Sequence, residues 1–255
     1  MDIAEPTDRN PTLYLSDDKI FYTIEGEGEY AGHPSVFMRL SMCNLTCKGF
    51  ASPDSPHGCD SFVSWSVKNK MTFDEIFDYM AQRSYNCHLK DGAIWKITGG
   101  EPMIQQLKLM VLVRVFGERF GFCPHIDFET NATITPLERW VTKYSATFTT
   151  SPKLSNNGDP EDKRFKPDVL KWHVDHNSGF KFVINDERDL NEVLEKYIHN
   201  PAIKVPKERV WLMPCCGSRQ EHSEKSVMVA ELCKKHNLKF SPRLQLVIWD
   251  KALKV

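Results

Sequence analysis

Short apolar segments alternate with helical segments along most of this chain, and this alternation limits the folds that it can form. The expected strands are residues 36–40, 94–97, 125–128, 146–149, 180–184 and 210–213, with residues 244–249 as a closing strand. The expected helices are residues 72–80, 102–120, 190–198 and 218–236. Strands that alternate with helices in this way usually pair in parallel through right-handed crossovers.

The predicted fold class is therefore α/β, with a partial (open) parallel β/α barrel of about six strands. A closed barrel of this kind needs about eight strands. Functional groups are expected at the C-terminal ends of the strands, where such sheets bind ligands. We expect residues 1–18 to be a loosely ordered leader and residues 19–255 to form a single domain.

Charge and hydropathy argue against some partners. The formal net charge is −1, which gives no electrostatic grip on nucleic acid or on an anionic membrane. No apolar run reaches the roughly 20 residues that a membrane-spanning helix needs. Residues 1–10 are polar and acidic, unlike a secretory signal, so we expect a cytoplasmic protein. In that reducing compartment the eight cysteines favour metal or catalytic roles over disulfides.

Three cysteines share a loop after the first expected strand. Cys43, Cys47 and Cys59 have the spacing C-x3-C-x11-C. Three thiolates on one loop can hold three irons of a 4Fe-4S cluster and leave the fourth iron open. The amino and carboxylate groups of S-adenosylmethionine can chelate such an iron. A structural zinc site is the alternative, with Cys87-His88 as further ligands, although zinc prefers four ligands in short pairs.

A glycine motif, Thr98-Gly99-Gly100-Glu101-Pro102, follows the strand at 94–97 and opens a helix. Two glycines let a backbone approach a ligand closely, and exposed backbone groups can bind the amino end of a zwitterion. A turn before a helix that starts with proline gives the same letters. The motif is therefore informative only together with the cysteine loop upstream.

Other polar side chains have simpler explanations. Cys87, Cys123 and Cys233 are expected to fill the core, because free cysteine is usually buried. Glu25 and Glu27 are most simply solvated charges in a glycine-rich turn.

Together these motifs resemble the radical S-adenosylmethionine superfamily, and within it the 7-carboxy-7-deazaguanine synthase family. The resemblance covers nearly everything from about residue 20 onward. The matching residues are Phe21–Gly28, Gly32, Pro34, Phe37, Arg39, Cys43–Leu45, Cys59–Ser61, Thr98–Pro102, Glu129–Asn131, Ser151–Lys153, Lys181–Val183, Met213–Pro214 and Ser241–Leu244.

The resemblance implies a radical S-adenosylmethionine lyase with a 4Fe-4S cluster, S-adenosylmethionine and Mg²⁺ as cofactors. Its reaction would be the radical-mediated ring contraction of 6-carboxy-5,6,7,8-tetrahydropterin to 7-carboxy-7-deazaguanine with loss of ammonia, in queuosine-type 7-deazapurine biosynthesis. The resemblance also implies a homodimer and an electron donor such as flavodoxin. It implies neither a nucleic-acid partner nor a membrane partner.

The resemblance assigns roles position by position. The cluster ligands would be Cys43, Cys47 and Cys59, and Mg²⁺ would bind Ser61. The S-adenosylmethionine site would comprise Gly58, Asp60, Gly100, Ser151, Pro152, Lys153, Met213, Pro214, Cys215 and Cys216. The substrate site would comprise Ile24, Glu25, Gly26, Glu27, Arg39 and Thr98. No side chain is assigned as catalytic, because the cofactor carries the chemistry.

Two of these roles also make chemical sense. Arg39 lies on an apolar strand, where an unpaired guanidinium would be costly, so it needs a partner. A guanidinium is the natural bidentate partner of a carboxylate such as that of the pterin. Glu25 or Glu27 would accept hydrogen bonds from the amino and N–H edge of the pterin.

The chain departs from the family pattern in places. Eleven residues separate Cys47 from Cys59, where the family usually has a short gap, so Lys48–Gly58 is interpreted as a loop excursion. Ser61 replaces the usual threonine and keeps an oxygen for Mg²⁺. Glu25 replaces the commoner glutamine. Cys215-Cys216 replaces a more polar pair, and Gln245 stands where histidine or another polar residue is expected.

Two other functions stay open at this point. A glycyl-radical-enzyme activating protein would share the cluster and the glycine motif but act on a protein. A non-catalytic metal-binding module would bind zinc without sulfide and would not cleave S-adenosylmethionine.

Overall fold

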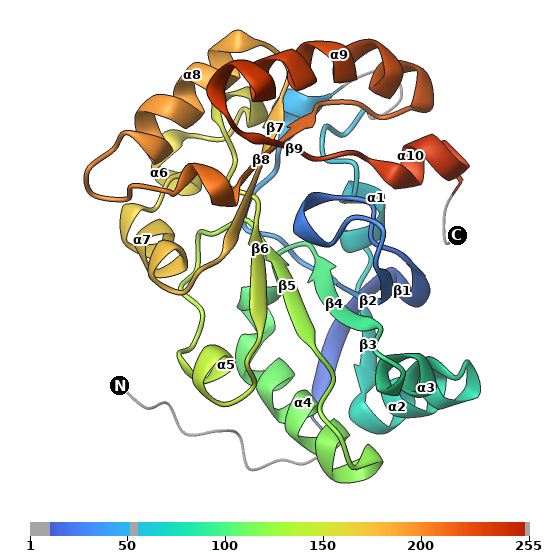
Figure 1. Ribbon diagram of the computed structural model, residues 1–255. Helices are drawn as coiled ribbons and strands as arrows, with labels where there is room; N and C mark the ends of the chain where they lie inside the picture. Colours follow the sequence, from blue (N-terminus) through green and yellow to red (C-terminus); the bar gives the residue numbers. More distant parts are fainter. Residues whose placement is uncertain (1–10, 52–55, 253–255) are drawn as a thin grey trace.

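The computed structural model describes residues 11–51 and 56–252, and one nine-stranded sheet runs through them (Figure 1). The strand order is β3-β1-β2-β4-β5-β6-β7-β8-β9. The strands are β1 (Thr12–Ile24), β2 (Pro34–Leu40), β3 (Asn69–Thr72), β4 (Ile94–Gly99), β5 (Ile126–Thr130), β6 (Thr147–Thr150), β7 (Gly179–Ile184), β8 (Val210–Pro214) and β9 (Lys239–Phe240). Neighbours from β2 to β9 are parallel, and β1 is antiparallel to β2 and β3. Because β3 and β9 are free edges of this sheet, the barrel is open, as predicted.

The helices connect the strands or follow the last one, and most of them pack on the outer side of the sheet (Figure 1). They are α1 (Phe62–Trp65), α2 (Phe73–Gln82), α3 (Tyr85–Lys90), α4 (Gln106–Phe120), α5 (Arg139–Thr142), α6 (Glu161–Arg164), α7 (Pro167–Asp175), α8 (Glu187–Val193), α9 (Arg219–His236) and α10 (Leu244–Trp249). A π-helical turn, Leu194–Ile198, continues α8. Among the described residues, no helix combines the length and the hydropathy needed to cross a bilayer.

Local sequence signals explain where the main helices begin and end. The predicted capping box is present at α2: Thr72 Oγ1 accepts from the backbone N–H of Glu75, whose carboxylate accepts from the Thr72 N–H. A single 3₁₀ turn, Pro102–Gln105, leads into α4. Gly121 ends α4 with a φ of 77°, a left-handed conformation that glycine adopts without strain.

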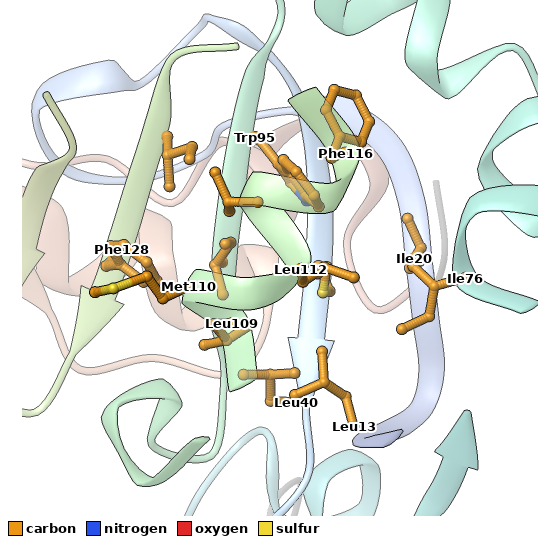
Figure 2. Close-up of a cluster of buried hydrophobic side chains, with 14 of the residues drawn as sticks. Leu13, Ile20, Leu40, Ile76, Trp95, Leu109, Met110, Leu112, Phe116 and Phe128 are labelled. Atoms are coloured by element: carbon orange, nitrogen blue, oxygen red, sulfur yellow. The ribbon is translucent and has the colours of Figure 1, made fainter. Parts of the chain in front are cut away.

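The larger part of the core lies between α4 and the strands β2, β4 and β5. Figure 2 shows Leu112 and Phe116 of α4 beside Trp95 of β4, on the side of the sheet that also carries Phe128 of β5. The rings of Trp95 and Phe116 lie 4.9 Å apart, centroid to centroid, and both side chains are fully buried. A second apolar cluster lies between β7, β8 and the helices α8 and α9.

Alternate residues of the parallel strands point the other way, into the concave side of the open barrel. On β4, Trp95 and Ile97 pack in the outer core, whereas Lys96 and Thr98 face inward. The neighbouring strands also point charged or hydroxyl side chains inward, namely Asp127 and Glu129 on β5, Thr147 and Thr149 on β6, and Lys181 on β7. This follows from the period of two in a strand, and it gives the barrel a polar interior behind an apolar wall.

The N-terminal expectation needs correction. Residues 12–18, expected in a loosely ordered leader, form the first half of β1 and pair with β2 and β3. The pairing register of β1 shifts between Leu15 and Ile20, and this irregularity interrupts the alternation that would have revealed one long strand. Residues 1–10 of the expected leader lie outside the described residues.

The expected strand at residues 244–249 is wrong: this segment is α10. Its apolar letters suggested a strand, but the backbone bonds locally, with the N–H groups of Leu246 and Val247 donating to the carbonyl of Arg243. The Leu244 N–H also donates to the Gly26 carbonyl at 3.0 Å, which fixes the helix start over the loop after β1. Strands β1, β3 and β9 and helices α1, α3, α5, α6 and α7 were not predicted either.

The expectation that three cysteines fill the core holds for only one of them. Cys233 lies on the buried face of α9, whereas Cys87 on α3 and Cys123 before β5 are exposed. These two exposed thiols provide controls for cysteine substitutions elsewhere.

Replacing Phe116 with alanine should lower the free energy of unfolding by about 3–5 kcal/mol, because it opens a cavity within a ring cluster. The matched control is Val227→Ala on α9, whose side chain is 68% exposed; it should change stability by no more than about 0.5 kcal/mol. Urea unfolding followed by circular dichroism measures both. Equal stability of the two variants would contradict the assigned core.

Candidate functional site

The cysteine loop begins where β2 ends, at the C-terminal edge of the parallel strands. Cys47 is buried, and Cys43 and Cys59 are partly buried. Burial raises the pKa of the Cys43 thiol to about 12, and the charges of Glu101, Cys47 and Cys59 act in the same direction. Burial also raises the pKa of Cys47 and of Cys59. The three thiols thus lie close enough to influence one another's ionisation.

Each thiol of this loop also receives an N–H hydrogen bond from a different part of the chain. The donor–sulfur pairs are Asn131 Nδ2 to Cys43 (3.9 Å), Asn157 Nδ2 to Cys47 (3.6 Å) and Trp65 Nε1 to Cys59 (3.5 Å). Hydrogen bonds to sulfur stabilise the thiolate and help to set the potential of a cluster that it binds.

The Asp159 carboxylate holds the turn that carries Cys47. It accepts from the backbone N–H groups of Thr46 at 3.0 Å and Cys47 at 2.9 Å, and from the Thr46 hydroxyl at 2.9 Å. Cys47 itself has a φ of 51°, a left-handed conformation that is costly for a residue with a side chain. Asn157 donates to Asp159 at 2.9 Å and so links this clamp to the Cys47 sulfur.

The segment between Cys47 and Cys59 closes back on itself. Gly58 has a φ of 88°, and a Cβ there would lie 2.4 Å from the carbonyl oxygen of Cys47. Only glycine fits such an approach. Of the predicted loop excursion Lys48–Gly58, residues 48–50 form a 3₁₀ turn, and residues 52–55 lie outside the described residues.

The three thiols of this loop do not converge on one point. In the described parts of the chain, no three His, Cys, Asp or Glu side chains converge as ligands of one metal ion would. A cluster binds each thiolate through a different iron, so its ligands surround it without meeting at one point.

Cys87-His88, the further ligands of the zinc alternative, lies elsewhere. The His88 ring stacks on Tyr22, with 4.0 Å between centroids, and Tyr22 pairs with Val36 near the start of β2. The cysteine loop leaves β2 at the opposite end, after Leu40, roughly 13 Å away at about 3.3 Å per residue.

The glycine motif packs directly against the cysteine loop. Cβ atoms at Gly99 and Gly100 would lie 2.2 Å from the carbonyl oxygen of Leu40 and 1.9 Å from that of Met42. The Gly100 N–H donates to Leu40 at 3.0 Å. Both glycines are therefore needed to seat the loop on the sheet, whatever ligand the motif also binds.

Glu101, the next residue of the motif, is fully buried and ties the loop region to β5. Its carboxylate accepts from the Met103 N–H at 3.0 Å, the Thr130 hydroxyl at 2.8 Å and the Asn131 N–H at 2.8 Å. Its own N–H donates to the Met42 carbonyl at 2.8 Å. The motif therefore sets the position of Asn131, the hydrogen-bond donor to Cys43.

A buried ion-pair group lies in the barrel interior, below the cysteine loop. The ammonium of Lys96 on β4 lies 2.6 Å from Asp127 Oδ2 on β5 and 2.9 Å from Glu25 Oε2 in the loop after β1. Thr149 on β6 accepts from the same ammonium at 3.3 Å. Lys96 and Asp127 are cross-strand neighbours in register, which is why they meet.

A second ion-pair group connects the interior to the cysteine loop. Lys181 on β7 contacts Glu27 at 2.5 Å and Glu129 on β5 at 2.6 Å. Arg243 bridges Glu27 at 2.9 Å and Asp60 at 2.7 Å, and Asp60 directly follows Cys59. A series of ion pairs thus runs from the barrel interior to Asp60 in the cysteine loop.

The network shifts the ionisation of its members. Burial alone would raise the pKa of Glu27, but Lys181 and Arg243 bring it well below its usual value. Burial raises the pKa of Glu25 above its usual value, and Lys96 opposes this. The named members are three basic side chains and five carboxylates, so negative charge is in excess: Lys96, Lys181 and Arg243 against Glu25, Glu27, Asp60, Asp127 and Glu129.

The residues predicted for the substrate are mostly in this interior. Glu25 and Glu27 are inside the network rather than solvated, which corrects the simpler explanation given above for them. Gly26 is buried against the Gln245 side chain, and Thr98 donates to Glu129 at 3.4 Å. Two residues predicted for the substrate site have different surroundings. Ile24 is 36% exposed and pairs with Pro34 at the far end of β2, and Arg39 lies over the Phe21 ring at 5.5 Å while its charge acts on Asp60.

The residues predicted for S-adenosylmethionine and Mg²⁺ lie on loops at the same edge. Lys153 donates to the Ser151 hydroxyl at 2.9 Å, and its charge acts on Cys47. Ser61 donates to Asp60 at 3.1 Å. The remaining positions end or follow strands at this edge or lie within the cysteine loop: Gly58, Gly100, Pro152, Met213, Pro214, Cys215 and Cys216. Arg243 donates to the Cys216 carbonyl, which ties this end of β8 to the network.

No role was predicted for several network members, namely Lys96, Asp127, Glu129, Lys181 and Arg243. The sequence does carry a signal for four of them. Each is a charged residue between apolar or β-branched neighbours on a short strand, as in Trp95-Lys96-Ile97 and Phe180-Lys181-Phe182. A charge in such a strand must find a partner, and adjacent parallel strands supply it.

Replacing Asp159 with alanine should release the Cys47 turn. Amide exchange of Thr46 and Cys47 should become about tenfold faster or more, because a hydrogen bond to a charged acceptor contributes about 1.5–3 kcal/mol. Hydrogen–deuterium exchange on the metal-free protein measures this. Asp175→Ala, an exposed change on α7, is the control. Unchanged exchange at residues 46 and 47 would contradict the clamp.

Comparisons with known proteins identify relatives of this chain. No family model matches the chain. A curated 7-carboxy-7-deazaguanine synthase from Halobacterium salinarum is 29% identical, with 99% of this chain and 99% of the relative aligned. Another, from Pyrobaculum aerophilum, is also 29% identical, over 92% of this chain and 94% of the relative. A third, from Hyperthermus butylicus, is 29% identical over 90% and 91%.

The fold has a solved counterpart. The crystal structure of QueE from Escherichia coli superposes with a TM-score of 0.60, covering 90% of this chain and 93% of that chain at 20% sequence identity. This similarity concerns the fold, and it agrees with the predicted open barrel. Along nearly its whole sequence, the chain is therefore a homologue of curated 7-carboxy-7-deazaguanine synthases, as the resemblance of its motifs predicted.

Proposed function

We propose that this chain is a 7-carboxy-7-deazaguanine synthase, a radical S-adenosylmethionine lyase. Its reaction contracts the ring of 6-carboxy-5,6,7,8-tetrahydropterin to 7-carboxy-7-deazaguanine and releases ammonia. The observation that carries this proposal is the alignment with curated synthases over 99% of both chains, within which the cysteine loop and the charged interior both fall. The same relatives favour the synthase over an activating enzyme or a non-catalytic module.

In this proposal Cys43, Cys47 and Cys59 hold a 4Fe-4S cluster. The support is that they share one loop, that each sulfur has an N–H donor, and that Asp159 fixes the Cys47 turn. When bound, the cluster and S-adenosylmethionine supply the radical chemistry. The protein's own part is to bind, orient and shield the reactants.

The loops around the cluster would hold S-adenosylmethionine and Mg²⁺. Both ligands bring positive charge, and the excess of carboxylates in the network offers it partners. The exposed part of Asp60 and the Ser61 hydroxyl face this region, and oxygen ligands suit Mg²⁺. The proposed set for S-adenosylmethionine is Gly58, Asp60, Gly100, Ser151–Lys153 and Met213–Cys216.

The substrate would lie between the two ion-pair groups. Its amino and N–H edge needs acceptors, which Glu25 and Glu27 provide from within the barrel. Its carboxylate needs a cation, and Arg39 is the proposed partner. Thr98 and Gly26 would complete the wall, with Ile24 at its rim.

The proposal also covers the oligomeric state of the protein, its electron donor and its cellular compartment. A homodimer and an electron donor such as flavodoxin are part of it, by the resemblance stated above, and neither a nucleic acid nor a membrane is proposed as a partner. The cysteines of the described residues are all free thiols. A reducing compartment such as the proposed cytoplasm keeps thiols in this state.

Anaerobic reconstitution with iron and sulfide tests the reaction. With reductant, Mg²⁺, S-adenosylmethionine and 6-carboxytetrahydropterin present, we expect 7-carboxy-7-deazaguanine, detected by mass spectrometry, and none when any component is left out. Formation of 5′-deoxyadenosine without that product would refute the substrate. Absence of both from protein that carries a 4Fe-4S cluster would refute the proposed function.

Cysteine substitutions test the cluster ligands. Cys43→Ala, Cys47→Ala and Cys59→Ala should each abolish the iron–sulfur absorbance and the bound sulfide, because each removes one of three ligands. Cys87→Ala and Cys123→Ala remove exposed thiols and should leave iron and sulfide content at the level of the unmodified protein. Loss of the cluster from Cys87→Ala, with retention in Cys59→Ala, would overturn the assignment.

A further inference from the structure

Lys96 occupies an unusual place for a lysine. It lies in the middle of β4 and is 1% exposed, with its whole side chain inside the barrel. Its ammonium donates to Asp127 at 2.6 Å and to Thr149 at 3.3 Å, and it lies 2.9 Å from Glu25 Oε2. Glu25 is 4% exposed and Asp127 is fully buried. One cation therefore serves two buried carboxylates.

Stability alone does not account for this arrangement. Taking each ion out of water costs several kcal/mol, and apolar residues of similar size often stabilise a fold as well or better. Asp127 already has the Lys96 ammonium and the hydroxyls of Thr147 and Thr149 as donors. Glu25 has fewer donors, so its carboxylate can accept more additional hydrogen bonds than that of Asp127.

The acceptor atoms of Glu25 are incompletely used. Oε1 accepts the backbone N–H of Glu27 at 3.1 Å. Oε2 is buried and lies 2.9 Å from the Lys96 ammonium, which lowers the pKa of Glu25 through its charge and a hydrogen bond. A carboxylate has about four acceptor sites on its two oxygens, so Glu25 can still accept hydrogen bonds from a ligand.

We propose that Lys96 is a positioning residue for substrate recognition: it keeps the Glu25 carboxylate ionised and holds it where its remaining acceptor sites can bind the adjacent N–H groups of the pyrimidinone ring. This inference rests on the proposed function and deepens it. A carboxylate accepts from both an amide N–H and a neighbouring amino group, whereas a protonated acid offers an O–H to them. By keeping Glu25 ionised, Lys96 thus favours the substrate tautomer whose edge donates both an amide N–H and an amino N–H.

The electrostatic surroundings of Glu25 come from four elements. Burial raises its pKa, and Lys96 is the strongest influence that lowers it; Glu129 raises it and Lys181 lowers it. The charged groups that face it are Lys96 on β4, Asp127 and Glu129 on β5, Lys181 on β7 and Glu27 on its own loop. Without Lys96 the pKa of Glu25 rises further, so the acid is neutral at low pH and regains its charge as pH rises.

The test is the pH dependence of KM in Lys96→Met. At the acid end of a pH 6–9 series, KM for the pterin should rise about tenfold or more over the unmodified enzyme, the equivalent of one charged hydrogen bond. KM should fall toward the unmodified value as pH increases, while kcat at saturation stays similar. Lys171→Met, an exposed lysine on α7, is the control and should match the unmodified enzyme.

The double variant Glu25→Gln, Lys96→Met separates positioning from structure. An amide cannot titrate in this range, so its KM should be independent of pH. A pH dependence like that of Lys96→Met would overturn the proposal, because another group would then be titrating. An unchanged or pH-independent KM in Lys96→Met would overturn it as well.

Glu25→Gln alone keeps the proposal testable if Lys96→Met does not fold. It replaces a charged acceptor with a neutral one, so KM should rise at every pH, and an unchanged KM would overturn the inference. Failure of the proposed function shows separately: the unmodified enzyme would then form no 7-carboxy-7-deazaguanine, whatever residue 96 is.

Discussion

The ion pairs buried inside the open barrel are the constraint on which the rest of the structure depends. Lys96, Lys181 and Arg243 can lie in the interior only because carboxylates from neighbouring strands and loops surround them. Those carboxylates come from segments far apart in the sequence. The network therefore joins the loop after β1, three central strands and α10 into one arrangement, and it leaves negative charge available for cationic ligands.

The cysteine loop is held in place at both of its ends. Its start is seated by Gly99 and Gly100, whose missing side chains let the backbone after β2 pass across the end of β4. Its end is held by Arg243, which bonds Asp60 next to Cys59. A cluster on this loop and a substrate in the interior would thus have a fixed separation, as a radical reaction that must exclude water requires.

Many strands and helices and part of the candidate site could be predicted from the sequence, and the reasons differ between elements. The central strands and α2 follow local signals, namely apolar runs and the Thr72–Glu75 capping box. The cysteine loop stands out by its spacing, and its role as the cluster ligand set is part of the proposed function. β1 was missed because a register shift breaks its alternation, and α10 because its apolar letters also suit a strand. The partners of Lys96 were not predictable from sequence spacing, since sheet register brings Asp127 to it and the loop after β1 brings Glu25.

The most direct test of the central claim is an anaerobic crystal structure of the reconstituted protein with S-adenosylmethionine and the pterin. We predict a cluster bonded to Cys43, Cys47 and Cys59, and a pterin ring within hydrogen-bonding distance of Glu25 inside the barrel. A pterin bound outside the interior, with the ion pairs of Lys96 and Lys181 untouched by any ligand, would contradict the claim that the buried network exists to receive the substrate.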